Sequence, residues 1–148
     1  MPNLNALALR SRLIRKPDAH KGDMGKVLLV GGAPGMAGAI FLSAYGSLYS
    51  GAGWTIVGVL DSKSAHVQID QPELMVQDLS CVVDTDHFIN GIVPDCLAIG
   101  PGLGLSDQAL QFLEAGLAFS GPLILDADAL NLIANHPRIA QLLRERKD

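Results

Sequence analysis

Hydrophobic residues gather in short runs along the chain, and glycine turns or amphipathic stretches separate these runs. Residues 27–30 are continuously apolar and are followed by two glycines, which is typical of a strand buried on both faces. Residues 54–60 are apolar and rich in β-branched side chains, so they predict a second strand. Between them, residues 38–50 have a helical pattern that Gly51 ends. A helix that connects two strands in this way predicts a parallel pair.

The helix predicted at 38–50 carries large and small side chains on different positions. Its large apolar residues have helical spacing, and we expect them to face the core: Phe41, Leu42, Tyr45, Leu48 and Tyr49. Its small residues are Ala39, Ser43, Gly46, Ser47 and Ser50. A glycine inside a helix costs about 1 kcal/mol relative to alanine. We therefore expect close approach of the helix to the sheet to compensate for Gly46.

The alternation of strand and helix continues in the second half of the chain. The predicted elements are strands at 96–99 and 123–125 and helices at 106–119, 128–134 and 138–147. Ser106 is the expected N-cap of the first of these helices, and Pro137 precedes the last. The apolar residues of segment 61–91 follow neither a sustained helical nor a sustained strand period, so no helix or strand is predicted there. The expected fold is α/β, a three-layer α/β/α arrangement with a mainly parallel sheet in one domain, residues 1–148, with a lead-in segment at 1–19.

The composition fits this fold and narrows the choice of partners. The chain is 49% hydrophobic but only 5% aromatic, and it contains 16 glycines, so small and aliphatic side chains build the core. The formal net charge is −4, and the basic residues form no stripe along a predicted element, which argues against nucleic acid as a partner. The densest basic stretch, residues 10–21, is broken by Pro17 and Asp18. We interpret it as a solvated segment rather than an anion-binding arm.

The cysteines and the lengths of the apolar runs indicate the cellular compartment of the protein. Cys81 and Cys96 lack C-x-x-C spacing and lie in or beside apolar runs, where a thiol behaves as a small hydrophobe. No apolar stretch approaches the roughly 20 residues that span a bilayer, and the N-terminus has no uninterrupted apolar signal region. We therefore expect a soluble, cytoplasmic protein with no membrane partner.

Two glycine turns follow predicted strands and precede predicted helices. Residues 31–39 read GGAPGMAGA, and residues 100–104 read GPGLG. Free N–H groups at a helix start favour an anion, and small residues let a phosphate come close. Ala33 and Pro34 break the dinucleotide pattern G-x-G-x-x-G, and no G-K-[ST] ending of a P-loop is present. The two turns could line one ligand crevice, or their glycines could serve only tight turns.

The polar residues near these turns offer few candidates for chemistry. Asp126 follows a predicted strand, where its carboxylate could bind a ligand hydroxyl or be satisfied within its own loop. Asp128 stands where a helix N-cap belongs, and we predict that role for it. The four histidines have neither metal-site spacing nor a nucleophile partner that can be inferred, and they are His20, His66, His87 and His136. We expect no metal site and assign no catalytic residue.

With these motifs the chain resembles the ribokinase-like, ADP-dependent NAD(P)H-hydrate dehydratases. Each shared motif is weak evidence by itself, but the motifs occur in the order found in the family. Together they cover about residues 15 to 135. The motifs are His20-Lys21-Gly22 with Gly25, Gly31-Gly32, Gly38-Ala39, Gly51-Ala52-Gly53, Pro72-Glu73-Leu74-Met75, Gly100-Pro101-Gly102-Leu103-Gly104, and Asp126-Ala127-Asp128-Ala129-Leu130-Asn131. The resemblance implies a small-molecule nucleotide as partner.

The resemblance also implies a chemistry and a set of binding residues. In the family, ADP or ATP phosphorylates the ring hydroxyl of hydrated NADH or NADPH, and loss of phosphate, a better leaving group than hydroxide, restores the cofactor. Mg²⁺ is a further candidate cofactor. The residues that the resemblance places at the cofactor are Gly38, Ala39, Gly102, Leu103, Gly104, Asp126 and Asn131, with His20 and Lys21 on a loop near the site.

Two family motifs, T-P-H-P-x-E and G-D-x-x-x-G, do not occur in the chain. In the family they supply most of the ADP site and the aspartate that acts as general base. We therefore expect a C-terminally truncated domain that does not catalyse the family's reaction by itself. The alternatives are a non-catalytic nucleotide-binding remnant and a small-molecule kinase of the same superfold. We also expect self-association into a homo-oligomer, because an incomplete fold would leave apolar surface or a sheet edge uncovered.

Overall fold

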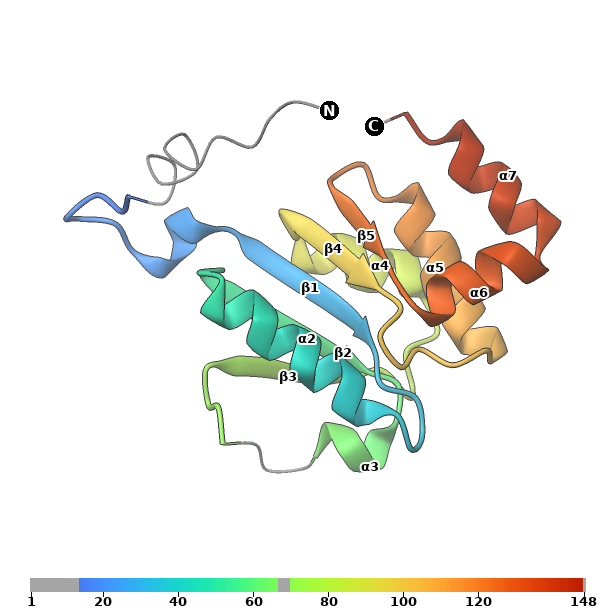
Figure 1. Ribbon diagram of the computed structural model, residues 1–148, viewed down its shortest axis with the longest axis horizontal. Coiled ribbons are helices and arrows are strands. Elements are labelled where there is room, and N and C mark those ends of the chain that lie inside the picture. Colours follow the sequence, from blue (N-terminus) through green and yellow to red (C-terminus); the bar gives the residue numbers. More distant parts are fainter. Residues whose placement is uncertain (1–13, 67–69, 148) are drawn as a thin grey trace.

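A computed structural model describes residues 14–66 and 70–147, and its centre is a sheet of five parallel strands in the order β3-β2-β1-β4-β5 (Figure 1). The strands are β1 (Lys26–Gly31), β2 (Trp54–Val59), β3 (Leu74–Asp78), β4 (Cys96–Ile99) and β5 (Leu123–Leu125). Val27 of β1 pairs with Thr55 of β2 on one side and with Cys96 of β4 on the other. The predicted α/β fold with a parallel sheet is confirmed.

Helices lie on both faces of the sheet, but they cover the two faces unequally (Figure 1). The helical elements are η1 (Lys21–Met24), α2 (Ala37–Tyr49), α3 (Ser62–Ala65), α4 (Thr85–Ile92), α5 (Asp107–Ala118), α6 (Asp128–Asn135) and α7 (Pro137–Glu145). Residues of α4 to α7 share one apolar cluster with the sheet, whereas α2 packs in a second cluster on the opposite face. Within the described ranges, no helix is long and apolar enough to cross a membrane.

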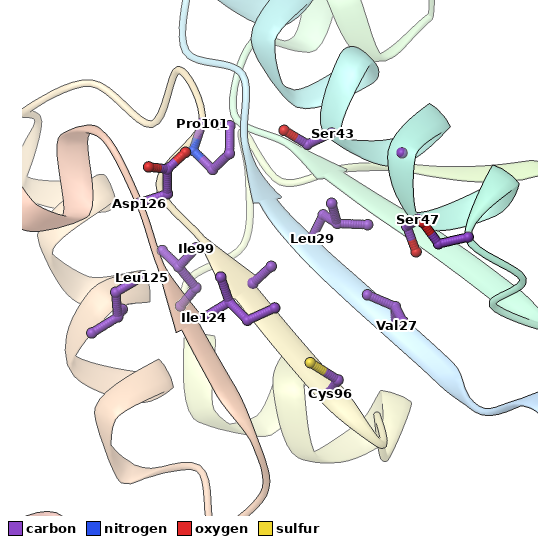
Figure 2. A pocket seen from close by; sticks show the side chains of 13 residues that line it. Val27, Leu29, Ser43, Ser47, Cys96, Ile99, Pro101, Ile124, Leu125 and Asp126 are labelled. Atoms are coloured by element: carbon purple, nitrogen blue, oxygen red, sulfur yellow. The ribbon is translucent and has the colours of Figure 1, made fainter. Parts of the chain in front are cut away.

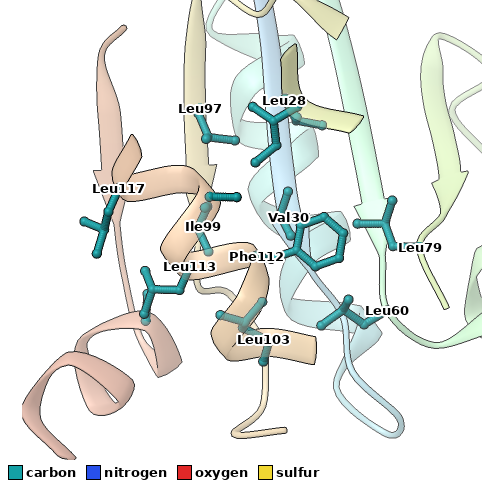
Figure 3. Close-up of a cluster of buried hydrophobic side chains, with 14 of the residues drawn as sticks. Leu28, Val30, Leu60, Leu79, Leu97, Ile99, Leu103, Phe112, Leu113 and Leu117 are labelled. Carbon is teal, nitrogen blue, oxygen red and sulfur yellow. The ribbon is translucent and has the colours of Figure 1, made fainter. Parts of the chain in front are cut away.

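The alternation of side chains along β1 explains why its sequence is continuously apolar. Leu28 and Val30 point into the cluster shared with α5, where Phe112 is fully buried (Figure 3). Leu29 points to the other face and packs with Ile40 of α2. Successive side chains of a strand face opposite sides, so a strand covered on both faces needs apolar residues at every position. The prediction of a strand buried on both faces is confirmed for β1.

The predicted apolar face of α2 is partly wrong. Leu42 and Tyr49 are 71% and 73% exposed, whereas Ile40 and Ala44 are fully buried against the sheet. Phe41, Tyr45 and Leu48 do pack against the cluster on this face, so only some of the large side chains mark the core side of the helix. Gly46 also does not approach the sheet closely, because a Cβ added there would meet no atom within 4 Å.

The segment 61–91, for which no element was predicted, contains three short elements. Asp61 caps α3 by accepting hydrogen bonds from the N–H groups of Lys63 and Ser64, and Asp84 caps α4. β3 lies at the edge of the sheet and buries only one of its five residues. Elements this short and this exposed are too brief for a hydrophobic period to emerge.

The lead-in segment predicted at 1–19 lies largely outside the described residues, which begin at Ile14. The basic residues of the stretch 10–21 that precede Ile14 are likewise outside them. Arg15, the first described basic residue, donates from Nη2 to the carbonyl oxygen of Gly51 at 3.3 Å. This contact ties the start of the described chain to the end of α2.

Candidate functional site

The two glycine turns lie side by side at the carboxyl edge of the sheet. One follows β1 and leads into α2, and the other follows the neighbouring strand β4 and leads into α5. The N–H of Gly32 donates to the carbonyl of Pro101 at 3.2 Å, and the N–H of Ala33 donates to that of Gly102 at 2.6 Å. The helices after these strands leave on opposite faces of the sheet, so this is the switch point at which open α/β sheets bind ligands.

Two glycines of the second turn are required by the packing of its neighbours. Gly102 has φ +60°, and a Cβ there would collide with the carbonyl oxygen of Met36. Gly100 has φ +137°, and a Cβ there would collide with the carbonyl oxygen of Asp126. The turn itself therefore needs these two glycines, whether or not a ligand binds.

The start of α2 is the exposed part of the predicted site. Gly38 and Ala39 are exposed, and open space surrounds Gly38. The N-cap residue Met36 makes no side-chain cap, and the first N–H groups of a helix have no partner within the helix. The amides of Ala37 and Gly38 are therefore available to an anion at the positive end of the helix dipole.

The second turn is less accessible than the resemblance implies. Gly102, Leu103 and Gly104 are all buried. The Leu103 side chain is fully buried and packs in the core cluster with Phe112 (Figure 3), and its place at the cofactor stays a prediction. The N–H of Gly104 is occupied by Asp128.

The predicted N-cap role of Asp128 is wrong. Asp128 is the first residue of α6, and the cap position is held by Ala127, which has φ +43° and makes no side-chain cap. The Asp128 Oδ2 instead accepts from the Gly104 N–H at 2.9 Å, and its Oδ1 accepts from Asn131 Nδ2 at 3.2 Å. Asp128 thus uses its carboxylate to join α6 to the second glycine turn. Asn131 is brought near the turn through this carboxylate.

A groove of about 430 Å³ runs from the glycine turns along α2 (Figure 2). Asp126 and Pro101 lie at the end nearest the turns, and Ser43 lies across from them on α2. Asp126 is exposed, and its side chain accepts none of the hydrogen bonds found among the described residues. Farther along, Cys96 lies in the groove, and burial raises the pKa of its thiol. Asp126 is therefore the acidic group at this end of an otherwise mainly apolar groove.

His20 and Lys21 lie at the opposite edge of the sheet. Lys21 is in η1, before β1, and its Nζ is 4.6 Å from the ring centre of Trp54, the first residue of β2. The six residues of β1 separate this loop from the glycine turns by about 17 Å at 3.3 Å per residue. The structure thus places this loop at the amino end of β1, away from the glycine turns, and a role for His20 and Lys21 near the bound cofactor stays a prediction.

A polar cluster that the sequence pattern did not reveal lies at the carboxyl ends of β2 and β3. Hydrogen bonds from the Ser80 hydroxyl and N–H, and from the Ser62 hydroxyl, lower the pKa of Asp78 to about 2. His66 Nε2 is 3.4 Å from Asp78 Oδ2. Across residues 14–66 and 70–147, no three His, Cys, Asp or Glu side chains gather as a metal site would require.

Comparisons with known proteins match one family along most of the chain. The model of the NAD(P)H-hydrate dehydratase family matches residues 27–147. The ADP-dependent (S)-NAD(P)H-hydrate dehydratase of Lactiplantibacillus plantarum is 36% identical over 141 residues, which are 93% of this chain and 50% of that protein. The bifunctional NAD(P)H-hydrate repair enzyme of Escherichia coli K12 is 37% identical over 123 residues, 83% of this chain and 23% of that enzyme.

Solved structures share the fold. A ribokinase-like superfamily protein from Enterococcus faecalis V583 superposes with a TM-score of 0.71 at 30% identity, over 91% of this chain and 55% of that one. The ADP/ATP-dependent NAD(P)H-hydrate dehydratase of Bacillus subtilis, co-crystallised with ATP and Mg²⁺, has a TM-score of 0.54 at 25% identity and covers 79% of this chain and 42% of that one. The chain spans about half the length of the Lactiplantibacillus plantarum relative and about a quarter of the Escherichia coli one.

Proposed function

The chain belongs to the NAD(P)H-hydrate dehydratase family, and from that premise we propose that it binds hydrated NADH or NADPH at the carboxyl edge of its sheet. The reaction in which it would take part is the ADP- or ATP-dependent dehydration that repairs this damaged cofactor. The relatives are named for that activity, and the chain matches only part of their length.

The observation that carries the proposal is the exposed start of α2 at the switch point of the sheet. Gly38 and Ala39 are open to solvent there, and the second glycine turn supports them from behind by its contact with Met36. A diphosphate group of the nucleotide would accept hydrogen bonds from the free amides of Ala37 and Gly38. Asp126, exposed at the same end of the groove, would accept a hydrogen bond from a ligand hydroxyl.

The buried turn residues take a supporting role in this proposal. Gly102 and Gly104 hold the start of α2 and Asp128 in place, and Leu103 anchors the turn in the core. ADP or ATP would supply the phosphoryl group that turns the ring hydroxyl into a good leaving group. No described residue is assigned as the base for that transfer, and among the described residues no three His, Cys, Asp or Glu side chains gather. The proposal for this chain is therefore binding of the hydrated cofactor, and turnover is left to the assay below.

The test is calorimetric titration of the chain with hydrated NADH, NADH and ADP. We expect hydrated NADH to bind and Gly38→Asp to weaken its binding at least about 5-fold, because a carboxylate beside a bound phosphate adds roughly 1 to 4 kcal/mol of repulsion at 4 Å. Gly38 has open space, so this variant should fold. Leu42→Asp is the matched control, since it places the same charge on an exposed position of α2 outside the groove.

Two results would contradict the proposal. One is the absence of binding heat for hydrated NADH up to about 1 mM, which corresponds to less than about 4 kcal/mol of binding free energy. The other is equal weakening by Gly38→Asp and Leu42→Asp. A parallel assay of ADP-dependent recovery of NADH absorbance, run beside the Lactiplantibacillus plantarum relative, separates binding from turnover.

A further inference from the structure

The proposed nucleotide site has a second side, which is formed by the residues that follow β2. Asp61 comes after this strand and lies beside the first glycine turn. We propose that Asp61 binds the adenosine ribose of the hydrated cofactor and makes the chain selective for hydrated NADH over hydrated NADPH, whose 2′-phosphate it repels. This inference rests on the proposed function, because it assigns the two halves of the dinucleotide within that site.

The position of Asp61 follows from backbone contacts between the end of β2 and the first glycine turn. The N–H of Asp61 donates to the carbonyl of Gly32 at 3.0 Å, and the N–H of Leu60 donates to that of Gly31 at 2.9 Å. A Cβ added at Gly32 would lie 3.5 Å from the Cα of Ala37, so the start of α2 packs on the same glycine. Asp61 and the free amides of α2 therefore flank Gly32. Figure 1 shows α3, the helix that Asp61 caps, beside the start of α2.

The two sides of the start of α2 differ in their chemistry. On the side of β4 and β5 lies the mainly apolar groove that ends at Asp126. On the side of β2 and β3, Ser62 donates to Asp78 at 2.8 Å and Ser64 donates to Asp61 at 2.6 Å. A dinucleotide whose diphosphate lies at the start of α2 extends over both sides. The groove suits the hydrated ring, whose hydroxyl Asp126 would accept, and the polar side suits the adenosine ribose with its two hydroxyls.

The strand order supports this orientation. The order β3-β2-β1-β4-β5 matches the first five strands of sheets that bind dinucleotides. In those sheets the diphosphate lies at the start of the helix after the first strand, and an acidic residue about 20 residues further along binds the ribose 2′-hydroxyl. This chain lacks their G-x-G-x-x-G motif, but Asp61 follows the first glycine turn at a similar interval and comes directly after the neighbouring strand pair.

The Asp61 carboxylate is charged and can accept a further hydrogen bond. The hydrogen bond from the Ser64 hydroxyl, with those from the N–H groups of Lys63 and Ser64, lowers the pKa of Asp61, so this group is ionised at neutral pH. Its bonds from Lys63 and Ser64 use three of the roughly four lone-pair positions of a carboxylate. Because Asp61 is also partly exposed, a ribose hydroxyl would donate to the remaining position.

The charge of Asp61 distinguishes a ribose hydroxyl from a 2′-phosphate. A phosphate monoester carries about −1.5 to −2 charges at pH 7. A carboxylate about 4 Å from such a group weakens its binding at least about 10-fold, even at the dielectric constant of water. Asp78, whose pKa is about 2, adds a charge of the same sign at the end of β3. Lys63 opposes this effect, but it contributes least among the groups that lower the pKa of Asp61.

The test compares two pairs of ligands that differ only at the 2′-position. Calorimetry measures the affinities of hydrated NADH and hydrated NADPH, and those of ADP-ribose and its 2′-phosphate, which lack the nicotinamide ring. We expect the parent chain to prefer the member without the 2′-phosphate at least about 10-fold in each pair. Asp61→Asn should reduce this preference to within about 3-fold, because it removes the charge. Asparagine caps a helix as well as aspartate does, so this variant should fold.

Asp84→Asn is the matched control for the change of charge. Asp84 caps α4 by accepting from the N–H of His87 at 2.8 Å, much as Asp61 caps α3, but α4 packs on the opposite face of the sheet. This variant should keep both preferences within about 3-fold of those of the parent chain. Gly38→Asp should weaken the binding of all these ligands together, because each of them carries the diphosphate. Unfolding curves of the three variants check that they fold.

Three outcomes would overturn the proposal. The first is a parent chain that binds both members of each pair equally or prefers the 2′-phosphate, which would assign this side to the basic residues Lys63 and His66. The second is a preference that Asp61→Asn retains in full. The third is an equal loss of preference in Asp61→Asn and Asp84→Asn, which would make it an effect of net charge. Selective binding of ADP-ribose without binding of hydrated NADH would support the role of Asp61 and contradict the proposed function, so the two failures are distinguishable.

Discussion

Asp128 and Asp126 are two residues apart, and the structure predicts opposite effects for their removal. Asp128 accepts a hydrogen bond from the buried Gly104 N–H at 2.9 Å and another from Asn131 at 3.2 Å. Asp126 is exposed and lines the end of the groove. The Asp128→Ala variant should therefore lose stability, whereas Asp126→Ala should lose ligand affinity at unchanged stability.

The loss in the free energy of unfolding that we expect for Asp128→Ala follows from these contacts. A hydrogen bond to a charged group contributes about 1.5 to 3 kcal/mol, and the partial exposure of this carboxylate favours the lower end. Removing the carboxylate also leaves the Gly104 N–H in a buried turn without its acceptor. We expect a loss of about 2 kcal/mol in the free energy of unfolding, which corresponds to a fall of about 1 M in the urea midpoint.

Urea unfolding followed by circular dichroism measures this difference. Asp126→Ala should stay within about 0.5 kcal/mol of the parent chain. Asp128→Asn is a second control, because its side-chain oxygen can still accept from Gly104 and should recover part of the loss. Equal midpoints for Asp128→Ala and Asp126→Ala, or a lower midpoint for Asp126→Ala, would refute the assignment of a positioning role to Asp128.

Three further substitutions test the packing and the polar cluster. Phe112→Ala should cost about 3 to 5 kcal/mol, because the ring is fully buried and stacks edge-on with Phe88, and a urea midpoint unchanged from the parent would contradict it. Gly102→Ala should destabilise by at least about 2 kcal/mol through its positive φ and a collision with backbone, which thermal unfolding measures. The Asp78 pKa of about 2 lies below the ordinary 3.8, so the stability that its ionised form contributes is present above about pH 4 and is lost as the pH falls toward 2. The free energy of unfolding of the Asp78→Asn variant, measured across this pH range, should lack that acid-dependent loss. An identical pH profile in the parent and in the variant would count against this role of Asp78.

The fold was predictable where the hydrophobic pattern is long or continuous. Residues 27–30 of β1 are continuously apolar because both faces of the strand are covered, and Ser106 caps α5 by accepting from the Ala109 N–H at 3.2 Å, as its sequence position predicts. β3 could not be predicted, because an edge strand with one buried residue carries almost no periodic signal. The exposed Leu42 shows a related limit, since size and apolarity do not say which side of a helix meets the sheet.

The candidate site was predictable in its turns and less so in its individual residues. Glycines after β1 and β4 indicated a binding edge, and the hydrogen bond from Gly32 to Pro101 joins the two turns there. The burial of Leu103 and the use of Asp128 by Gly104 depend on contacts between segments far apart in the chain. No local pattern could have revealed either one.

The sequence by itself determined the order of strands and helices outside residues 61–91, the glycine turns at the strand ends, and the family to which the chain belongs. These features depend on residues close together in the chain, where side-chain period and backbone freedom act directly. Only the tertiary structure decided that Lys21 lies at the far edge of the sheet, that Asp128 supports a turn, and that an apolar groove beside α2 stays open. Those features depend on which segments pack together, and that is settled by the burial of apolar surface across the whole sheet.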